Sequence, residues 1–196
     1  MDNINIAILA SGSGSNAENI ARYLSSSQNN GAGVNVSLIL SNKADAYVLE
    51  RARRLGIKFI VFSKSEMEEG SVVDTILEEH HIDFVILAGF LLKFPERLVK
   101  KYQDRVINIH PALLPKYGGK GMYGERVHQA VIAAKERESG ITIHLVNEIY
   151  DNGAHLFQAK CTITENDTAE TLAAKIHELE SEYFPEVIYN YICKFK

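Results

Sequence analysis

Asn108 and His110 stand two residues apart in the segment Asn108-Ile109-His110-Pro111, at the end of a predicted strand. Alternate residues of a strand point to the same face, so the amide and the imidazole should lie side by side. An amide can donate hydrogen bonds to a developing oxyanion, and an imidazole can move protons near neutral pH. The pair therefore predicts acid–base chemistry at a strand end. The alternative is a histidine whose ring is satisfied by the backbone.

A glycine-rich turn, residues 11–16 (SGSGSN), joins an apolar strand to a helix. Glycines let the backbone turn sharply, and the N–H groups at a helix start favour an anion such as a phosphate. An ordinary capped turn is the alternative, because short glycine loops are weak signals. Ala17 stands where a dinucleotide-binding turn has its third glycine, so a nicotinamide-dependent oxidoreductase stays open at this point. The second predicted strand ends in Ser41-Asn42-Lys43, without the acidic residue that would hold a ribose in such an enzyme.

Asp151 is a third candidate, in the turn sequence YDNG. Aspartate is common in turns for structural reasons, but a carboxylate close to His110 would raise the pKa of the imidazole and favour its charged form. His144 and His155 fall in predicted strands, where they would line a pocket or belong to the core. No HExxH or HxxEH spacing occurs, so the sequence gives a metal site little support.

The chain up to residue 110 alternates between strand-like and helix-like segments. Residues 4–10 are apolar on both faces, and the glycine-rich segment 11–16 follows them. This pattern is typical of a central parallel strand. We expect further strands at 33–41, 57–63, 83–89 and 105–110, and helices at 16–25, 44–56, 71–81 and 95–102. This alternation predicts an α/β fold with a doubly wound, mostly parallel sheet and helices on both faces. Ligands gather at the carboxyl ends of such strands, where SGSGSN, LAGF and NIHP all fall.

The pattern changes beyond Pro111. We expect a Gly- and Pro-rich loop at 112–124, a helix at 125–136, and an antiparallel hairpin of strands 140–148 and 155–164 around the turn IYDNG. A long amphipathic helix follows, with apolar residues at Leu172, Ile176 and Leu179. Pro185 should kink or end that helix. Without repeats or linkers, residues 1–196 are predicted to form one domain.

The composition excludes several classes of protein. The 196 residues are 46% apolar and 23% charged, which fits one compact domain rather than a disordered chain. The net charge of −4 argues against a broad basic face for nucleic acid. No apolar run reaches the roughly 18 residues of a membrane span, and the N-terminus lacks the basic region of a secretory signal. Cys161 and Cys193 are isolated, which indicates a reducing cytoplasm rather than a disulfide framework.

Five segments occur in a distinctive order along nearly the whole chain: ILASGSGSN, LSNKADAYVLERA, VILAGF, NIHPALLPKY and YDNGA. Together they resemble the phosphoribosylglycinamide formyltransferases of purine (IMP) biosynthesis, and the NIHP-x-LLP block is highly specific to formyl transfer from folate. The resemblance implies a Rossmann-like formyltransferase fold and a single formyltransferase domain. It also implies transfer of the formyl group of 10-formyltetrahydrofolate to the amine of N1-(5-phosphoribosyl)glycinamide, giving the N-formyl product and tetrahydrofolate, with no metal.

The resemblance also implies roles for residues that match the family's motifs. Asn108, His110 and Asp151 would be the catalytic trio, with a protonated His110 and Asn108 stabilising the oxyanion and Asp151 keeping His110 charged. Phosphoribosylglycinamide would be held by Gly14, Ser15, Asn16 and Glu180. The folate would be held by Leu91, Leu92, Lys93, Phe94 and Asn108, and by the loop residues Asn147, Glu148, Ile149 and Tyr150. The expected partners are small molecules, without nucleic acid or membrane, for a cytoplasmic monomer or homodimer.

The sequence departs from the family pattern around the loop that follows His110. Ala112 replaces a serine of the motif, and the loop 116–124 is longer than in many relatives. A histidine expected near the next helix is replaced by Val127, with His128 one position later. The remaining alternatives are another folate-dependent formyl transferase or a deformylase of the same fold. A methionyl-tRNA formyltransferase would need a second domain and a basic surface, and a formyltetrahydrofolate deformylase would have His at position 111.

Overall fold

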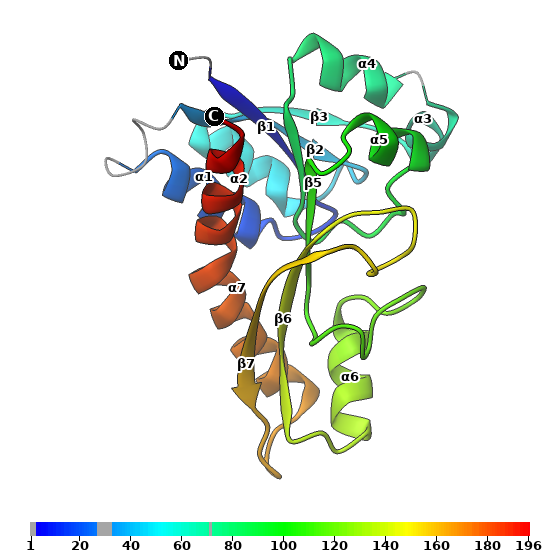
Figure 1. Ribbon diagram of the computed structural model, residues 1–196, viewed down its shortest axis with the longest axis vertical. Coiled ribbons are helices and arrows are strands. Elements are labelled where there is room, and N and C mark those ends of the chain that lie inside the picture. The colour runs from blue at the N-terminus through cyan, green and yellow to red at the C-terminus, as the bar shows by residue number, and fades with distance from the viewer. Residues whose placement is uncertain (1–2, 27–32, 71) are drawn as a thin grey trace.

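A seven-stranded sheet runs through the molecule and carries helices on both faces (Figure 1). The computed structural model describes residues 3–26, 33–70 and 72–196. Residues 1–2, 27–32 and 71 lie outside this described part, and Ser71 is the first residue of the predicted helix 71–81. The strands are β1 (Ile4–Leu9), β2 (Val34–Ser41), β3 (Lys58–Val61), β4 (Phe84–Leu87), β5 (Val106–His110), β6 (Glu138–Leu145) and β7 (His155–Thr162). The helices are α1 (Ser15–Leu24), α2 (Tyr47–Leu55), α3 (Lys64–Glu69), α4 (Val72–Glu79), α5 (Glu96–Lys101), α6 (Glu125–Ala133), α7 (Ala169–Ile192) and the short 3-10 helix η2 (Cys193–Phe195).

The strand order is β3-β2-β1-β4-β5-β6-β7. The first five strands pair in parallel, whereas β6 pairs antiparallel with β5 and β7 antiparallel with β6. This confirms the predicted doubly wound sheet with a C-terminal antiparallel hairpin and a long final helix. The hairpin connection is longer than a tight turn and spans residues 146–154.

The apolar run of β1 is explained by two separate cores. Ile6 and Ile8 pack on the face covered by α1, α2 and α7, whereas Ala7 and Leu9 pack on the face covered by α3, α4 and α5. A parallel strand buried on both faces needs apolar side chains at every position. All four of these side chains have no exposed surface.

Helix α3 was not predicted, although its start carries a recognisable signal. The Ser63 hydroxyl accepts a hydrogen bond from the backbone N–H of Glu66, and the Glu66 carboxylate accepts one from the N–H of Ser63. This reciprocal pair is a capping box. It turns the chain after β3 and begins the layer that covers the second core.

Pro185 was expected to kink or end the last helix, and it does not end helix α7, because the helix continues to Ile192. Proline has no N–H to donate to the carbonyl four residues earlier, which is that of Ser181. The side chain of Asn19, on α1, donates to this carbonyl oxygen at 2.6 Å. A neighbouring helix therefore satisfies the group that proline leaves free. No helix among the described residues is long and apolar enough to cross a membrane.

Candidate active site

A cavity of about 620 Å³ opens at the carboxyl ends of the parallel strands. Its walls come from the turn after β1, the segment after β4, the end of β5, the loop before α6, the β6–β7 connection and α7. All the site residues expected from the sequence line this one cavity: Gly14, Ser15, Asn16, Leu91, Leu92, Lys93, Phe94, Asn108, His110, Asn147, Glu148, Ile149, Tyr150, Asp151 and Glu180.

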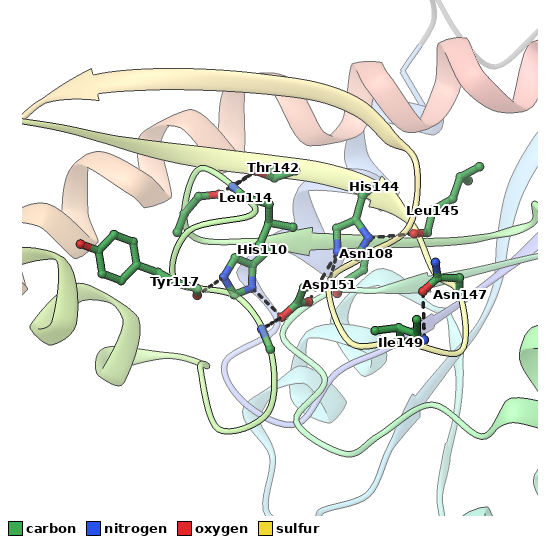
Figure 2. A network of polar contacts seen from close by, with 12 residues as sticks. Asn108, His110, Leu114, Tyr117, Thr142, His144, Leu145, Asn147, Ile149 and Asp151 are labelled. Carbon is green, nitrogen blue, oxygen red and sulfur yellow. Dashed lines mark hydrogen bonds and ion pairs between the residues drawn. The ribbon is translucent and has the colours of Figure 1, made fainter.

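Asn108 is oriented by a buried histidine on the neighbouring strand. Residue 144 lies opposite residue 108 in the β5–β6 register, and His144 Nε2 is 3.0 Å from Asn108 Nδ2 (Figure 2). His144 Nδ1 is 2.8 Å from the Leu145 carbonyl oxygen, which can only accept, so Nδ1 carries the hydrogen. Nε2 is the remaining ring nitrogen, and it accepts from the Asn108 amide when it carries no hydrogen. One Nδ2 hydrogen of Asn108 is used in this way, and the second is left for a ligand.

His110 is held by the loop that follows it. Its Nε2 is 2.8 Å from the Tyr117 carbonyl oxygen, so Nε2 carries the hydrogen and the neutral ring leaves Nδ1 unprotonated. That Nδ1 lies 3.7 Å from Asp151 Oδ2, and a dashed line in Figure 2 marks this contact. The amide, the imidazole and the carboxylate therefore do meet in one place.

The charge of His110 differs from the expectation. Burial lowers the pKa of His110 below its ordinary value, and the nearby Asp151 carboxylate and Tyr117 carbonyl only partly oppose it. His110 is 4% exposed. Removing an imidazolium from water therefore costs more free energy than the attraction of one carboxylate at 3.7 Å returns. The unliganded site thus holds a neutral His110, not the protonated one that the resemblance implied.

Asp151 remains a carboxylate despite its partial burial. Burial alone would raise its pKa, but the contact with His144 and the backbone N–H of Gly119 hold the pKa below its ordinary value. Gly119 donates to Asp151 Oδ2 at 2.8 Å, and His144 Nε2 lies 3.7 Å from Oδ1. A Cβ at Gly153 would lie 1.7 Å from the Leu145 carbonyl oxygen, so the turn after Asp151 requires glycine at this position.

Thr142 anchors the loop after His110 to the hairpin. Its hydroxyl donates to the Ala112 carbonyl oxygen at 2.7 Å and accepts from the Leu114 N–H at 3.0 Å. Ala112 itself is completely buried in the core, so the missing serine hydroxyl leaves no gap in the site wall. The residue that lines the cavity at the start of α6 is His128, while Val127 faces the core.

The opposite end of the cavity is built from backbone groups. Gly14 occupies the N-cap of α1 with φ +74°, and no side chain caps the first turn, so its N–H groups are available to a ligand. A Cβ at Gly14 would lie 2.4 Å from Val48 Cγ2. Arg51 supports the turn from outside by donating to the Ser13 carbonyl oxygen at 2.8 Å and pairing with Glu18.

Two segments face each other across the mouth of the cavity. The first, residues 91–94, is tied to the end of β1 because the Leu91 N–H donates to the Ser11 hydroxyl at 3.0 Å. The second, residues 147–150, belongs to the β6–β7 connection. The Lys93 ammonium lies 5.7 Å from the centre of the Tyr150 ring, so the two segments approach each other. Leu91, Ile149 and Tyr150 are exposed, which leaves apolar surface for a flat ligand.

Three histidines of the cavity were not assigned a role from the sequence. His144 was left open between pocket and core, His128 was noted only as lying one position after Val127, and the helical pattern around His177 predicts a solvated ring. His177 lies 3.6 Å from Glu180 on α7, and its pKa is raised by the hydrogen bond to Glu180. Within the described ranges no group of three or more His, Cys, Asp or Glu is placed to hold a metal ion.

The comparisons with known proteins agree with this geometry. Residues 4–188 match the family described as formyl transferase. The chain belongs to that family of one-carbon transferases.

Several proteins that are similar to this chain are named phosphoribosylglycinamide formyltransferases. The chloroplastic protein of Arabidopsis thaliana is 42% identical over 93% of this chain and 63% of its own length. The protein of Haemophilus influenzae is 34% identical over 93% of this chain and 84% of its own length. The chain thus spans about three fifths of the length of the plant relatives. The crystal structure of the phosphoribosylglycinamide formyltransferase from Anaplasma phagocytophilum superposes with a TM-score of 0.88, at 32% identity over 98% of this chain and 88% of that one.

Proposed function

We propose that this protein transfers the formyl group of 10-formyltetrahydrofolate to the amine of N1-(5-phosphoribosyl)glycinamide. One observation carries the proposal: a polar Asn108–His144–Asp151–His110 network and an uncapped glycine turn line opposite ends of one cavity. The names of the relatives support the same reaction.

The two substrates would enter from different sides. The phosphate would lie on the N–H groups of Gly14, Ser15 and Asn16, where the α1 dipole favours an anion. Glu180, which accepts a hydrogen bond from Asn16 at 2.9 Å, would hold the sugar next to it. The folate would lie between segments 91–94 and 147–150. This arrangement brings the amine and the formyl carbon together beside Asn108.

The chemistry follows from the tautomers of the two buried histidines. The amine nitrogen attacks the formyl carbon, and the carbonyl electron pair moves to oxygen. The second Nδ2 hydrogen of Asn108 donates to this oxyanion, because the first is held by His144. The unprotonated Nδ1 of His110 takes the proton that the amine loses, and Asp151 stabilises the imidazolium that forms.

The tetrahedral intermediate then collapses. The carbonyl re-forms, the bond to the folate nitrogen breaks, and His110 returns its proton to that nitrogen. The products are the N-formyl amide and tetrahydrofolate, and His110 is neutral again. Each step uses groups that are already in place before the substrates bind.

A direct assay tests this function. The purified protein is mixed with 10-formyltetrahydrofolate, with and without phosphoribosylglycinamide, and the loss of the formyl folate is followed by absorbance. Loss that needs the amine, with the formylated amine detected by mass spectrometry, is the expected result. Equal loss without the amine would instead show hydrolysis and would overturn the proposed transfer.

The proposal also covers the domain organisation, the location and the partners of the protein. We take residues 1–196 as a single formyltransferase domain, since one continuous sheet spans the molecule. Cys161 and Cys193 are free thiols, which supports a cytoplasmic location. The expected partners are the two small-molecule substrates, without nucleic acid or membrane, and the protein would act as a monomer or a homodimer.

A further inference from the structure

Two buried polar atoms of residues that line the cavity have no hydrogen-bond partner among the described residues: Nδ1 of His128 and Oδ1 of Asn16. His128 is 7% exposed and Asn16 is 9% exposed, and both residues line the cavity. A polar atom that is withdrawn from water without a partner costs free energy, so native proteins keep few of them. Two such atoms in one cavity indicate that a ligand completes them.

The orientation of Asn16 shows which kind of group is missing. Its Nδ2 donates to Glu180 Oε2 at 2.9 Å, which assigns the nitrogen to that side and leaves the amide oxygen without a donor. The Asn16 oxygen and the Glu180 carboxylate are both hydrogen-bond acceptors. This part of the wall therefore calls for a ligand that donates hydrogens.

His128 lines the same cavity as this acceptor pair and the reacting centre. It stands in the first turn of α6. Burial lowers the pKa of His128 below its ordinary value, and the carboxylates of Glu180 and Glu125 oppose this only in part. The ring is thus neutral at neutral pH and offers one nitrogen as a further acceptor.

A phosphoribosyl amine carries a matching set of donors. With its phosphate at the α1 turn, its ribose hydroxyls would lie beside Asn16 and Glu180, and its glycinamide N–H groups would point toward Asn108 and His110. We propose that His128 contacts this substrate between its sugar and its reacting amine, and that with Asn16 and Glu180 it forms an acceptor cluster that selects polyhydroxylated amines. This inference rests on the proposed function and adds a binding residue to it.

The test measures binding separately from turnover. Binding of phosphoribosylglycinamide is measured by calorimetry in the absence of folate, for the wild type and for His128→Leu and His128→Asn. We expect His128→Leu to weaken binding about tenfold, the loss of one hydrogen bond, while binding of the formyl folate changes less than about twofold. His128→Asn keeps a polar atom near the position of Nδ1 and should recover part of the affinity. The matched control is His80→Leu, since His80 lies at the end of α4 outside the cavity and should leave both affinities unchanged.

A second measurement does not depend on the variants folding. The ring nitrogen resonances of His128 in the wild type should shift on saturation with the amine and stay in place on saturation with the formyl folate alone. A folded His128→Leu variant with wild-type affinity for the amine, or unmoved His128 resonances in the bound wild type, would overturn the inference. Absence of any binding of the amine by the wild type would overturn the proposed function first, and this inference with it.

Discussion

The two ends of the cavity are built by different means. The end proposed to hold the phosphate, here called the phosphate end, consists of backbone N–H groups in one short turn, supported from behind by Arg51. The reacting end consists of four side chains from β5, β6 and the β6–β7 connection, each held by a partner distant in sequence or by a loop carbonyl. The first end needs only a local backbone shape. The second needs correct strand register, burial and tautomers at once.

This difference predicts where substitutions act. Changes at the reacting end should lower the rate of the chemical step, because the groups there gain importance as charge develops. Changes at the phosphate end should weaken substrate binding and leave the chemical step largely intact.

The largest effect is expected for Asn108→Ala. It removes the amide that donates to the oxyanion, so kcat should fall about 10²–10³-fold. Steady-state kinetics gives the value, and circular dichroism checks the fold. The control is Asn35→Ala, because Asn35 lies exposed on β2 away from the cavity. A folded Asn108→Ala enzyme with near-normal kcat would contradict the assigned role.

Asp151→Asn should lower kcat by about 10²-fold, within the usual range for acid–base groups. Asp151 raises the pKa of His110 against the opposing effect of burial, so its removal should lower that pKa further. Because neutral His110 accepts the proton, kcat/KM should rise with pH through a pKa below 6.5 in the wild type. In the variant this acidic limb should move to lower pH and reach a lower plateau. NMR titration of His110 checks the direction, and an unchanged pKa would show that the two groups do not interact.

Gly14→Ala probes the phosphate end. The left-handed backbone at position 14 and the contact with Val48 would distort the turn, so KM for the phosphoribosyl amine should rise about tenfold or more while kcat changes little. Gly12→Ala is the matched comparison, because a Cβ there meets nothing within 4 Å and the effect should be smaller. Equal effects of the two substitutions would argue against the steric explanation.

The smallest effect concerns the helix that passes both ends. Asn19→Ala removes the donor for the Ser181 carbonyl and should lower the free energy of unfolding by about 1 kcal/mol. In a Pro185→Ala background the new N–H can serve that carbonyl, so the same substitution should cost less. Urea denaturation of the four proteins measures the coupling. Additive effects would mean that Asn19 does not compensate for the proline.

The sequence predicts the two ends unequally well. The phosphate turn is contained in six consecutive residues, 11–16, and a strand-to-helix reading is enough to place it. The place of His144 depends on the register in which residue 144 lies opposite residue 108, and a slip by one residue would turn its ring to the other face. That register is a tertiary property, which is why His144 stayed ambiguous.

Other differences have equally specific causes. A nearby carboxylate favours a charged His110, but the depth of burial decides the balance, and burial follows only from the complete fold. The orphaned nitrogen of His128 is likewise visible only once α6 is packed. Helix α7 continues beyond Pro185, and the Ser181 carbonyl accepts a hydrogen bond from Asn19, which lies 162 positions earlier in the sequence. By contrast, the capping box at the start of α3 is formed by Ser63 and Glu66, whose types and spacing can be read directly from the sequence.

The loop between β5 and α6 shapes the reaction without offering a reactive side chain. The carbonyl of Tyr117 decides which ring nitrogen of His110 stays bare, and the N–H of Gly119 helps to keep Asp151 ionised. Both atoms belong to the main chain, at residues with φ +56° and +93°. Engineers who redesign this stretch should therefore preserve its dihedral angles before its residue types. A replacement loop with a different backbone conformation would lower the proposed activity, although every reactive side chain would still be present.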